Sequence, residues 1–272
     1  MILEHLFSCW AKISQQLKDA SYILLLVDYD GTLTPIVGRP ELANLPEDTR
    51  QLLEALAHQR RLTLAIISGR ALADIKSKVN MEGIIYAGNH GLEIEGPGIS
   101  FIHPVVNEIR PVLGVISAVL NRALGTIEGI LIEDKGLSLS LHYRLVAEDK
   151  TEEVKNIFER VIGGAKASGK VIITIGKKVY EVRPAVDWDK GKAVELLMRR
   201  CRKGGKNSGL VPIYLGDDLA DENAFKVIRD YGKGISVFVG EANQKTAANY
   251  SLESPIQVIK FLEMLLDSRP GG

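Results

Sequence analysis

The chain has 272 residues, with 34 Lys and Arg against 34 Asp and Glu, and 46% of its residues are hydrophobic while 6% are aromatic. This composition excludes a disordered chain, a coiled coil and a collagen-like repeat. A formal charge of zero gives no electrostatic reason to expect nucleic acid or an anionic membrane as a partner. We therefore expect a globular protein of one large or two modest domains, in which any charge that meets an anionic ligand is local.

The first 20 residues predict an amphipathic helix. Their apolar side chains recur at helical spacing: Leu3, Leu6, Phe7, Trp10, Ile13 and Leu17. Glu4 and His5 stand where a signal peptide would have its basic region, so we do not expect these residues to be a signal peptide. We expect the helix to pack on its own domain, with binding of a partner as the alternative reading.

Two cysteines, Cys9 and Cys201, lie far apart in the sequence and form no metal-ligand spacing. The longest aliphatic run, Ile23–Val27, is much shorter than the ~20 residues of a membrane span. We expect reduced thiols in a cytoplasmic protein that binds no membrane, and we expect a monomer.

Four short and almost wholly apolar runs predict buried strands of a parallel sheet. They are Ile23–Val27, Leu62–Ile67, Val211–Leu215 and Ile235–Val239. Helical patterns lie between them, at 46–58 and 192–200. Strands that alternate with helices favour a doubly wound α/β fold. A helix that begins at Ser254-Pro255 is expected to close the chain.

The middle of the chain predicts a separate α+β unit with the order αββαββ. The expected helices are at about 105–122 and 148–162, and the strand pairs are 130–133 with 137–143 and 171–175 with 179–182. Alternation of polar and apolar residues at 137–141 predicts an antiparallel sheet with one solvated face. We therefore place a substrate-specificity cap at 105–184, inside a catalytic core formed by 1–104 and 185–272.

Polar residues that follow the predicted core strands indicate a phosphate and metal site. Asp28 and Asp30 leave the first strand at i and i+2, so both can point the same way, and Gly31 permits a sharp turn. Other polar side chains follow two further strands: Ser68, Asp217, Asp218 and Asp221. The carboxyl ends of strands in an open α/β sheet meet at one crevice. Carboxylates gathered there repel one another, and Mg²⁺ would relieve the repulsion at a site that also holds a phosphate.

These residues form ordered motifs that resemble those of the haloacid dehalogenase (HAD) superfamily of phosphotransferases. The motifs are Asp28-Tyr29-Asp30-Gly31-Thr32-Leu33, Ser68-Gly69-Arg70, Lys190 and Gly216-Asp217-Asp218-Leu219-Ala220-Asp221. The resemblance implies a HAD-like fold, Asp28 as the nucleophile that forms an aspartyl-phosphate, and Asp30 as the general acid and then the general base. Ser68 and Lys190 would contact the phosphoryl group as further catalytic residues, with Lys192 as a rival for Lys190.

The same resemblance implies a set of Mg²⁺ ligands. Asp28 and Asp217 would offer carboxylates and Asp30 its backbone carbonyl, with Asp218 and Asp221 in support. Lys190 is preferred over Lys192 because it directly precedes Gly191.

Further segments narrow the resemblance to trehalose-6-phosphate phosphatases. They are Gly88–Glu93, Glu133–Gly136, His142–Arg144, Glu181–Pro184 and Gly216–Glu222. The last segment departs from that family at Ala220, where Thr is common, and this change removes one hydroxyl near the metal loop. The resemblance implies that Glu133, Lys135 and Glu181 hold the sugar, whose hydroxyls both donate and accept hydrogen bonds. It implies further substrate-binding residues: Gly69, Arg70, Asn89, His90 and Arg144.

The implied activity is hydrolysis of trehalose 6-phosphate to trehalose and phosphate in trehalose biosynthesis, with the cap closing over the sugar. Alternatives are the same chemistry on sucrose phosphate or a glycosyl-phosphoglycerate, and a sugar-phosphate binding protein without catalysis. A receiver domain also phosphorylates an Asp, but Asp30 and the cap insert argue against it. Residues 204–208 resemble a nucleotide P-loop yet lack its first glycine and its Lys-Ser/Thr pair, so they predict a surface loop.

Overall fold

The chain divides into two compact units in the computed structural model, which describes residues 3–176, 178–203, 209–241 and 245–268. The first unit comprises Met1–Phe101 and Trp188–Gly272, and the second comprises Ile102–Asp187. Phe101 and Trp188, where the chain leaves and re-enters the first unit, stack with ring centroids 5.1 Å apart. The expected cap boundaries, 105–184, thus compare with 102–187 in the structure.

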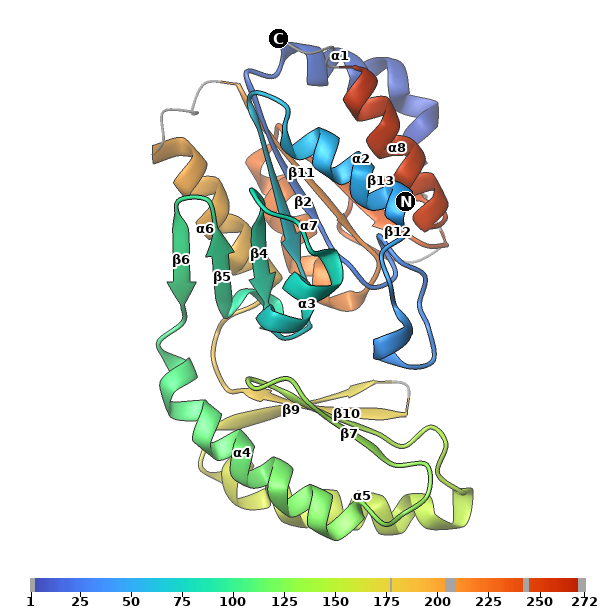
Figure 1. Ribbon diagram of the computed structural model, residues 1–272, viewed down its shortest axis with the longest axis vertical. Coiled ribbons are helices and arrows are strands. Elements are labelled where there is room, and N and C mark those ends of the chain that lie inside the picture. Colours follow the sequence, from blue (N-terminus) through green and yellow to red (C-terminus); the bar gives the residue numbers. More distant parts are fainter. Residues whose placement is uncertain (1–2, 177, 204–208, 242–244, 269–272) are drawn as a thin grey trace. The chain divides into compact units, whose positions relative to one another are not determined.

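The first unit is built on a mixed sheet, which among the described residues has nine strands in the order β1-β13-β12-β11-β2-β3-β4-β5-β6 (Figure 1). The strands are β1 Glu4–His5, β2 Tyr22–Val27, β3 Leu62–Ile67, β4 Ile85–Gly88, β5 Glu93–Gly96, β6 Ile99–Ile102, β11 Leu210–Gly216, β12 Ile235–Val239 and β13 Tyr250–Leu252. The strands from β1 to β4 in this order pair in parallel, whereas β5 pairs with β4 in the antiparallel sense.

Helices cover both faces of this sheet, which explains why its central strands are apolar throughout. One face packs against α1 Trp10–Asp19, α2 Glu47–Ala57, α3 Leu72–Val79 and α8 Pro255–Asp267, and the other against α6 Lys190–Lys203 and α7 Glu222–Tyr231. Within β2, Leu25 belongs to the first core cluster and Leu24 and Leu26 to the second. The doubly wound core predicted from the sequence is confirmed.

Two parts of the first unit differ from the expectation. The parallel core continues into an antiparallel edge, β4-β5-β6, because the chain reverses at Gly91 and Gly98, whose φ angles are +89° and +69°. At the N-terminus, the prediction of a single helix over residues 1–20 is wrong, because α1 covers only Trp10–Asp19. Strand β1 pairs with β13 at the opposite sheet edge, and a 3₁₀ helix, η1 Leu6–Cys9, precedes α1.

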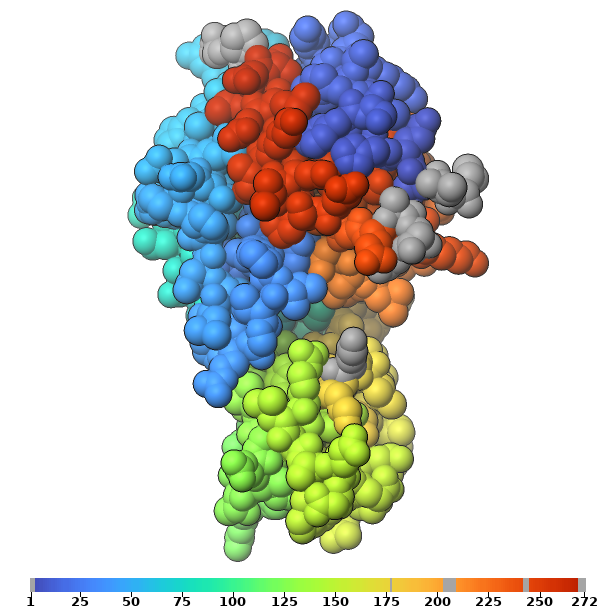
Figure 2. All heavy atoms as spheres, turned by 90° about the vertical axis from the view of Figure 1, so that its right-hand side faces the viewer, coloured from blue at the N-terminus to red at the C-terminus, as the bar shows by residue number. Residues whose placement is uncertain are grey.

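The N-terminal helix packs on its own unit, as predicted. Leu6, Ile13 and Leu17 are fully buried in the first core cluster. Trp10 meets Phe261 of α8 edge to face, with ring centroids 6.2 Å apart. Figure 2 shows the C-terminal helix (red) beside the N-terminal segment (dark blue) on the surface of this unit.

The second unit has the predicted order αββαββ. It contains helices α4 Val105–Leu124 and α5 Glu148–Ala167 and strands β7 Leu131–Asp134, β8 Leu139–His142, β9 Val171–Gly176 and β10 Val179–Pro184. The antiparallel sheet has the order β7-β8-β10-β9. Its apolar face is buried with the helices, and Phe158 of α5 stacks on Tyr180 at 4.6 Å between ring centroids.

The opposite face of this small sheet is polar but not wholly solvated, contrary to the expectation. Register places Glu133, Ser140 and Glu181 side by side in one row across three strands. Ser140, in the middle of this row, is 3% exposed. This row carries two of the candidate sugar-binding residues, Glu133 and Glu181.

Two remaining expectations concern the surface. The loop predicted at 204–208 lies outside the described residues. Within the described ranges, the helices are too short or too polar for any of them to span a membrane.

We predict that Leu17→Ala lowers the free energy of unfolding of the first unit by about 2–5 kcal/mol, because it leaves a cavity under α1. Its exposed neighbour in α1 provides the control: Lys18→Ala should change this free energy by less than about 0.5 kcal/mol. Both tryptophans, Trp10 and Trp188, lie in the first unit. Urea unfolding followed by tryptophan fluorescence therefore reports on this unit, and equal midpoints for the two variants would contradict the packing of α1.

Candidate active site

The parallel register brings the ends of three strands together. Val27, the last residue of β2, lies opposite Leu215 of β11 and Ile66 of β3. The backbone N–H of Asp28 continues this pairing by donating to the Leu215 carbonyl at 2.9 Å. The polar residues that follow β2, β3 and β11 therefore meet at one edge of the sheet, as the sequence predicted.

Lys190, the first residue of α6, joins two of these strand ends. Its Nζ donates to Asp28 Oδ1 and to Asp221 Oδ1, both at 2.7 Å, and its side chain is 3% exposed. Burial alone would lower the pKa of Lys190, but the carboxylates of Asp221 and Asp28 outweigh it and raise that pKa. The ammonium therefore stays charged beside Asp28.

Asp221 is fully buried and satisfied on both oxygens. Its Oδ1 accepts from Lys190 and from the Tyr214 hydroxyl at 2.6 Å, and its Oδ2 accepts the backbone N–H groups of Asp217 at 3.0 Å and Asp218 at 3.1 Å. Burial raises the pKa of Asp221, yet Lys190 and these hydrogen bonds outweigh burial, so the net shift is downward. Asp221 thus fixes both Lys190 and the loop after β11.

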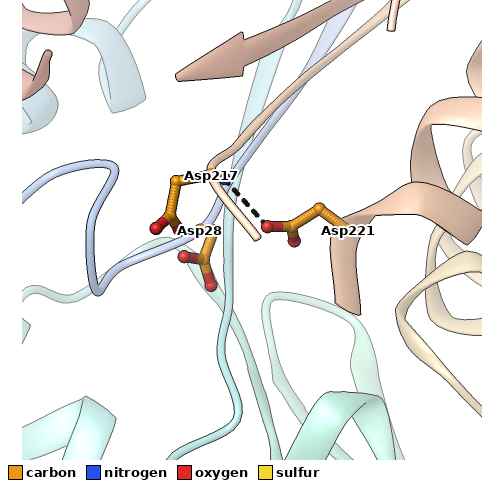
Figure 3. A group of neighbouring side chains, drawn as sticks. All are labelled: Asp28, Asp217 and Asp221. Carbon is orange, nitrogen blue, oxygen red and sulfur yellow. Dashed lines mark hydrogen bonds between the residues drawn. The ribbon is translucent and has the colours of Figure 1, made fainter. Parts of the chain in front are cut away.

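Asp28, Asp217 and Asp221 form an acidic group that could hold a metal ion (Figure 3). One carboxylate oxygen of each lies within 4.8 Å of the others. Burial, and then the charges of Asp218 and Asp221, raise the pKa of Asp217 to about 7. Burial also raises the pKa of Asp28, against the effect of Lys190. A cation bound between Asp28 and Asp217 would stabilise the ionised form of both.

Gly31 allows the loop after β2 to approach Asp217. Its φ is +81°, and a Cβ atom there would lie 2.0 Å from Asp217 Oδ2. Both the backbone conformation and the close approach require glycine. Asp218, in contrast, is exposed, and its side chain accepts from the Ala220 N–H at 2.8 Å as the N-cap of the short helix η4 Leu219–Asp221.

Asp30 is bound by Arg70 through both carboxylate oxygens. Arg70 Nε donates to Asp30 Oδ2 at 2.7 Å and Nη2 donates to Oδ1 at 2.6 Å. Arg70 also donates from Nη1 to Asp74 at 2.8 Å and from Nη2 to the Pro40 carbonyl at 2.8 Å. The resemblance assigned Arg70 to the substrate, whereas the structure turns its guanidinium toward Asp30, Asp74 and Pro40.

Ser68 and its neighbours lie beside this pair. Ser68 is 1% exposed and its Oγ accepts the Arg70 N–H at 3.1 Å, a contact that does not use the hydroxyl proton. Asn89 and His90, in the 3₁₀ helix η3 Asn89–Gly91, have φ angles of +49° and +58°. A Cβ atom on Gly69 would lie 2.8 Å from the His90 ring, so Gly69 permits this close contact. These residues are thus brought together next to Arg70.

The second unit gathers three candidate residues on its polar sheet face. Lys135 Nζ lies 3.7 Å from Glu133 Oε2 and 3.9 Å from Glu181 Oε1. Their side chains are only 16–22% exposed, and His142 Nε2 lies 3.3 Å from Glu133 Oε2. Arg144 is exposed in the segment after β8, and its role stays a prediction.

Sequence reasoning missed three residues that support these groups. Tyr214 lies within β11 and reads there as an ordinary core aromatic residue. Asp74 stands four residues after Arg70, and a search for charge pairs at that spacing could have found it. The Pro40 contact uses a backbone carbonyl, so no side-chain pattern could signal it.

Comparison with known proteins places the chain in a family. The family model for trehalose-phosphatase matches residues 26–256. A probable trehalose-phosphate phosphatase D from Arabidopsis thaliana is 36% identical over 256 residues, which cover 90% of this chain and 67% of that protein. The C-terminal domain of a Candida albicans trehalose-6-phosphate phosphatase is 25% identical with a TM-score of 0.81, covering 97% of this chain and 99% of that domain.

A wider likeness concerns the fold alone. A haloacid dehalogenase-like hydrolase from Bacteroides thetaiotaomicron is 17% identical, with a TM-score of 0.61 and coverage of 90% of this chain and 100% of that one. Its likeness agrees with the HAD-like fold implied by the four motifs. Together with the family match over residues 26–256, these findings establish that the chain belongs to the trehalose-phosphatase family of phosphomonoester hydrolases, within the HAD-like fold.

Proposed function

We propose that this chain hydrolyses trehalose 6-phosphate to trehalose and inorganic phosphate, with Asp28 as the nucleophile. The observation that carries the proposal is the buried Lys190, which holds Asp28 and Asp221 at 2.7 Å each at the carboxyl end of the sheet. A buried ammonium beside a carboxylate offsets the repulsion between that carboxylate and an anionic phosphoryl group. Family membership supports the choice of substrate.

The reaction we propose has two steps. An oxygen of Asp28 attacks phosphorus, the bond from phosphorus to the sugar oxygen breaks, and Asp30 gives its proton to that oxygen. Asp30 then takes a proton from water, which attacks the phosphorus of the aspartyl-phosphate and restores Asp28. Ser68 donates its hydroxyl to a phosphoryl oxygen, and Lys190 supplies positive charge beside it.

Mg²⁺ fits the acidic group, because Asp28 and Asp217 offer the carboxylate oxygens that this cation prefers as ligands. Burial raises the pKa of both carboxyl groups, and a bound cation would favour their ionised forms. Asp28 and Asp217, together with the Asp30 carbonyl, would hold it, since Asp221 already accepts from Lys190, Tyr214 and two backbone N–H groups. When bound, the cation supplies charge that stabilises the negative phosphoryl oxygens. Asp221 therefore positions its neighbours, and the exposed Asp218 caps η4.

The second unit supplies the sugar-binding groups in this proposal. Glu133 and Glu181 can accept hydrogen bonds from sugar hydroxyls and Lys135 can donate to them. In the first unit, Asn89 Oδ1 is buried and accepts no hydrogen bond from the described residues, so it could accept one from the substrate. We also propose that the protein acts as a monomer in the cytoplasm, where the thiols of Cys9 and Cys201, which no disulfide joins, stay reduced.

We predict that the protein releases phosphate from trehalose 6-phosphate faster than from sucrose 6-phosphate or a glucosyl-phosphoglycerate. Asp28→Asn should lower turnover roughly 10⁴-fold or more, because it removes the nucleophile while keeping its shape. A phosphate-release assay measures both, with circular dichroism to check the fold. Full activity of Asp28→Asn would contradict the nucleophile, and a preference for another ester would contradict the substrate.

Asp217→Asn should raise the Mg²⁺ concentration that gives half-maximal activity by about tenfold or more, because one of two carboxylate ligands becomes a neutral amide. The exposed Asp230 of α7 offers a control, and Asp230→Asn should leave this concentration unchanged. Mg²⁺ titrations of phosphate release measure it. An unaltered Mg²⁺ requirement in Asp217→Asn would rule out the proposed ligand.

Glu181→Ala should lower kcat/KM for trehalose 6-phosphate about 10- to 100-fold, the equivalent of about 1.5–3 kcal/mol for hydrogen bonds to a charged group. Hydrolysis of p-nitrophenyl phosphate, which has no sugar, should change less than about twofold. Glu128, exposed in the same unit, gives the matched control Glu128→Ala. Equal losses on both substrates would indicate a general structural defect and argue against sugar binding by Glu181.

A further inference from the structure

Besides Lys190, Arg70 is a buried cation of the described site, and all three nitrogens of its guanidinium donate hydrogen bonds. Its side chain is 6% exposed, while those of its partners Asp30 and Asp74 are 42% and 43% exposed. One edge of the guanidinium, Nε and Nη2, binds Asp30, and the remaining nitrogen, Nη1, binds Asp74. A planar fork held in this way has one orientation.

The rest of Arg70 is fixed as well. Its guanidinium lies over the ring of Tyr29, with 5.4 Å from Cζ to the ring centroid, and the Tyr29 hydroxyl donates to the Ala43 carbonyl at 3.0 Å. Its backbone N–H donates to Ser68 Oγ, and its carbonyl accepts the N–H of Asn89 at 2.7 Å. Arg70 is therefore the anchored member of its ion pair with Asp30, and Asp30 is the accessible one.

We propose that Asp74 and Arg70 are positioning residues for the general acid: Asp74 orients Arg70, and Arg70 orients the carboxyl group of Asp30. The proposal rests on the proposed function, in which Asp30 protonates the sugar oxygen. It gives Arg70 a role different from the substrate contact implied by the family resemblance, and it gives Asp74 a role that its sequence position alone did not indicate.

The chemistry explains why such positioning is useful. A sugar alkoxide is a poor leaving group, so proton donation to it must accompany cleavage of the bond between phosphorus and oxygen. Both oxygens of Asp30 accept hydrogen bonds from Arg70 in the structure. For proton donation, one of them gives up its hydrogen bond and carries the proton toward the sugar oxygen, while the other stays on Arg70. When the proton has moved, the carboxylate formed is paired with the guanidinium, which stabilises the products of the transfer.

The test uses two phosphate esters that differ in their need for an acid. Single-turnover rates are measured with trehalose 6-phosphate and, as the p-nitrophenol burst, with p-nitrophenyl phosphate, whose leaving group needs no proton. Asp74→Ala should lower the rate with trehalose 6-phosphate about tenfold, since small misplacements of a catalytic group have large effects. The burst rate with the aryl ester should change less than about twofold.

A double-mutant cycle separates positioning from a general structural effect. In an Asp30→Asn background, Asp74→Ala should change the trehalose 6-phosphate rate less than about twofold, because the carboxyl group that Asp74 helps to orient has been removed. The exposed ion pair of Lys76 and Glu95, 2.8 Å apart in the same unit, supplies a control: Glu95→Gln should leave all rates unchanged. Thermal melting confirms the fold, and Asp74→Asn replaces Asp74→Ala if the latter does not melt cooperatively.

Three results would overturn the inference. An equal tenfold loss in both backgrounds, or on both esters, would make Asp74 structural. If Asp74→Ala raised the KM for trehalose 6-phosphate but left the single-turnover rate unchanged, Arg70 would be assigned to substrate binding. Failure of the proposed function is seen separately, because the unmodified protein would then not hydrolyse trehalose 6-phosphate at all.

Discussion

The buried ammonium of Lys190 is the interaction on which the rest of the site depends. Asp28 and Asp221 are almost completely buried, and two carboxylates so close could not both stay ionised without a cation between them. Removing one partner of a buried ion pair costs about 3–5 kcal/mol, because the other charge is left uncompensated. The two segments of the first unit, before and after the insertion, are therefore joined by this ion pair as well as by strand pairing.

Tyr214 and Asp221 show how the site is supported from within the sheet. The Tyr214 hydroxyl and two backbone N–H groups hold Asp221, so Asp221 holds Lys190 at a fixed place beside Asp28. Arg70 forms a second group of the same kind with Asp30, with Asp74 as its support. Asp28 and Asp30 thus each face one anchored cation, and each cation binds a second carboxylate as well, Asp221 for Lys190 and Asp74 for Arg70.

Much of this arrangement could be predicted from the sequence, because strand ends in a doubly wound sheet meet at one edge. Apolar runs that stop at Asp28, Ser68 and Gly216 were enough to place these groups together. The orientation of Arg70 could not be predicted, since a guanidinium can equally face a substrate or a neighbouring carboxylate. Strands β5 and β6 were not predicted, because their short sequences mix polar and apolar residues and lack the apolar pattern of the central strands. The hydrogen bond from Tyr214 to Asp221 could not be predicted, because Tyr214 lies in a strand whose residues are all buried and therefore reads as a core residue.

The stacked rings of Phe101 and Trp188 have a consequence for how such a protein can change over time. They bring the two ends of the inserted unit to one point of the first unit, 5.1 Å apart between ring centroids. An insertion whose ends lie this close leaves the surrounding sheet topology undisturbed. The first unit, with Asp28 and Lys190, and the second unit, with Glu133, Lys135 and Glu181, can therefore vary independently, so that the first unit can accept a different inserted unit without a change in its own folding.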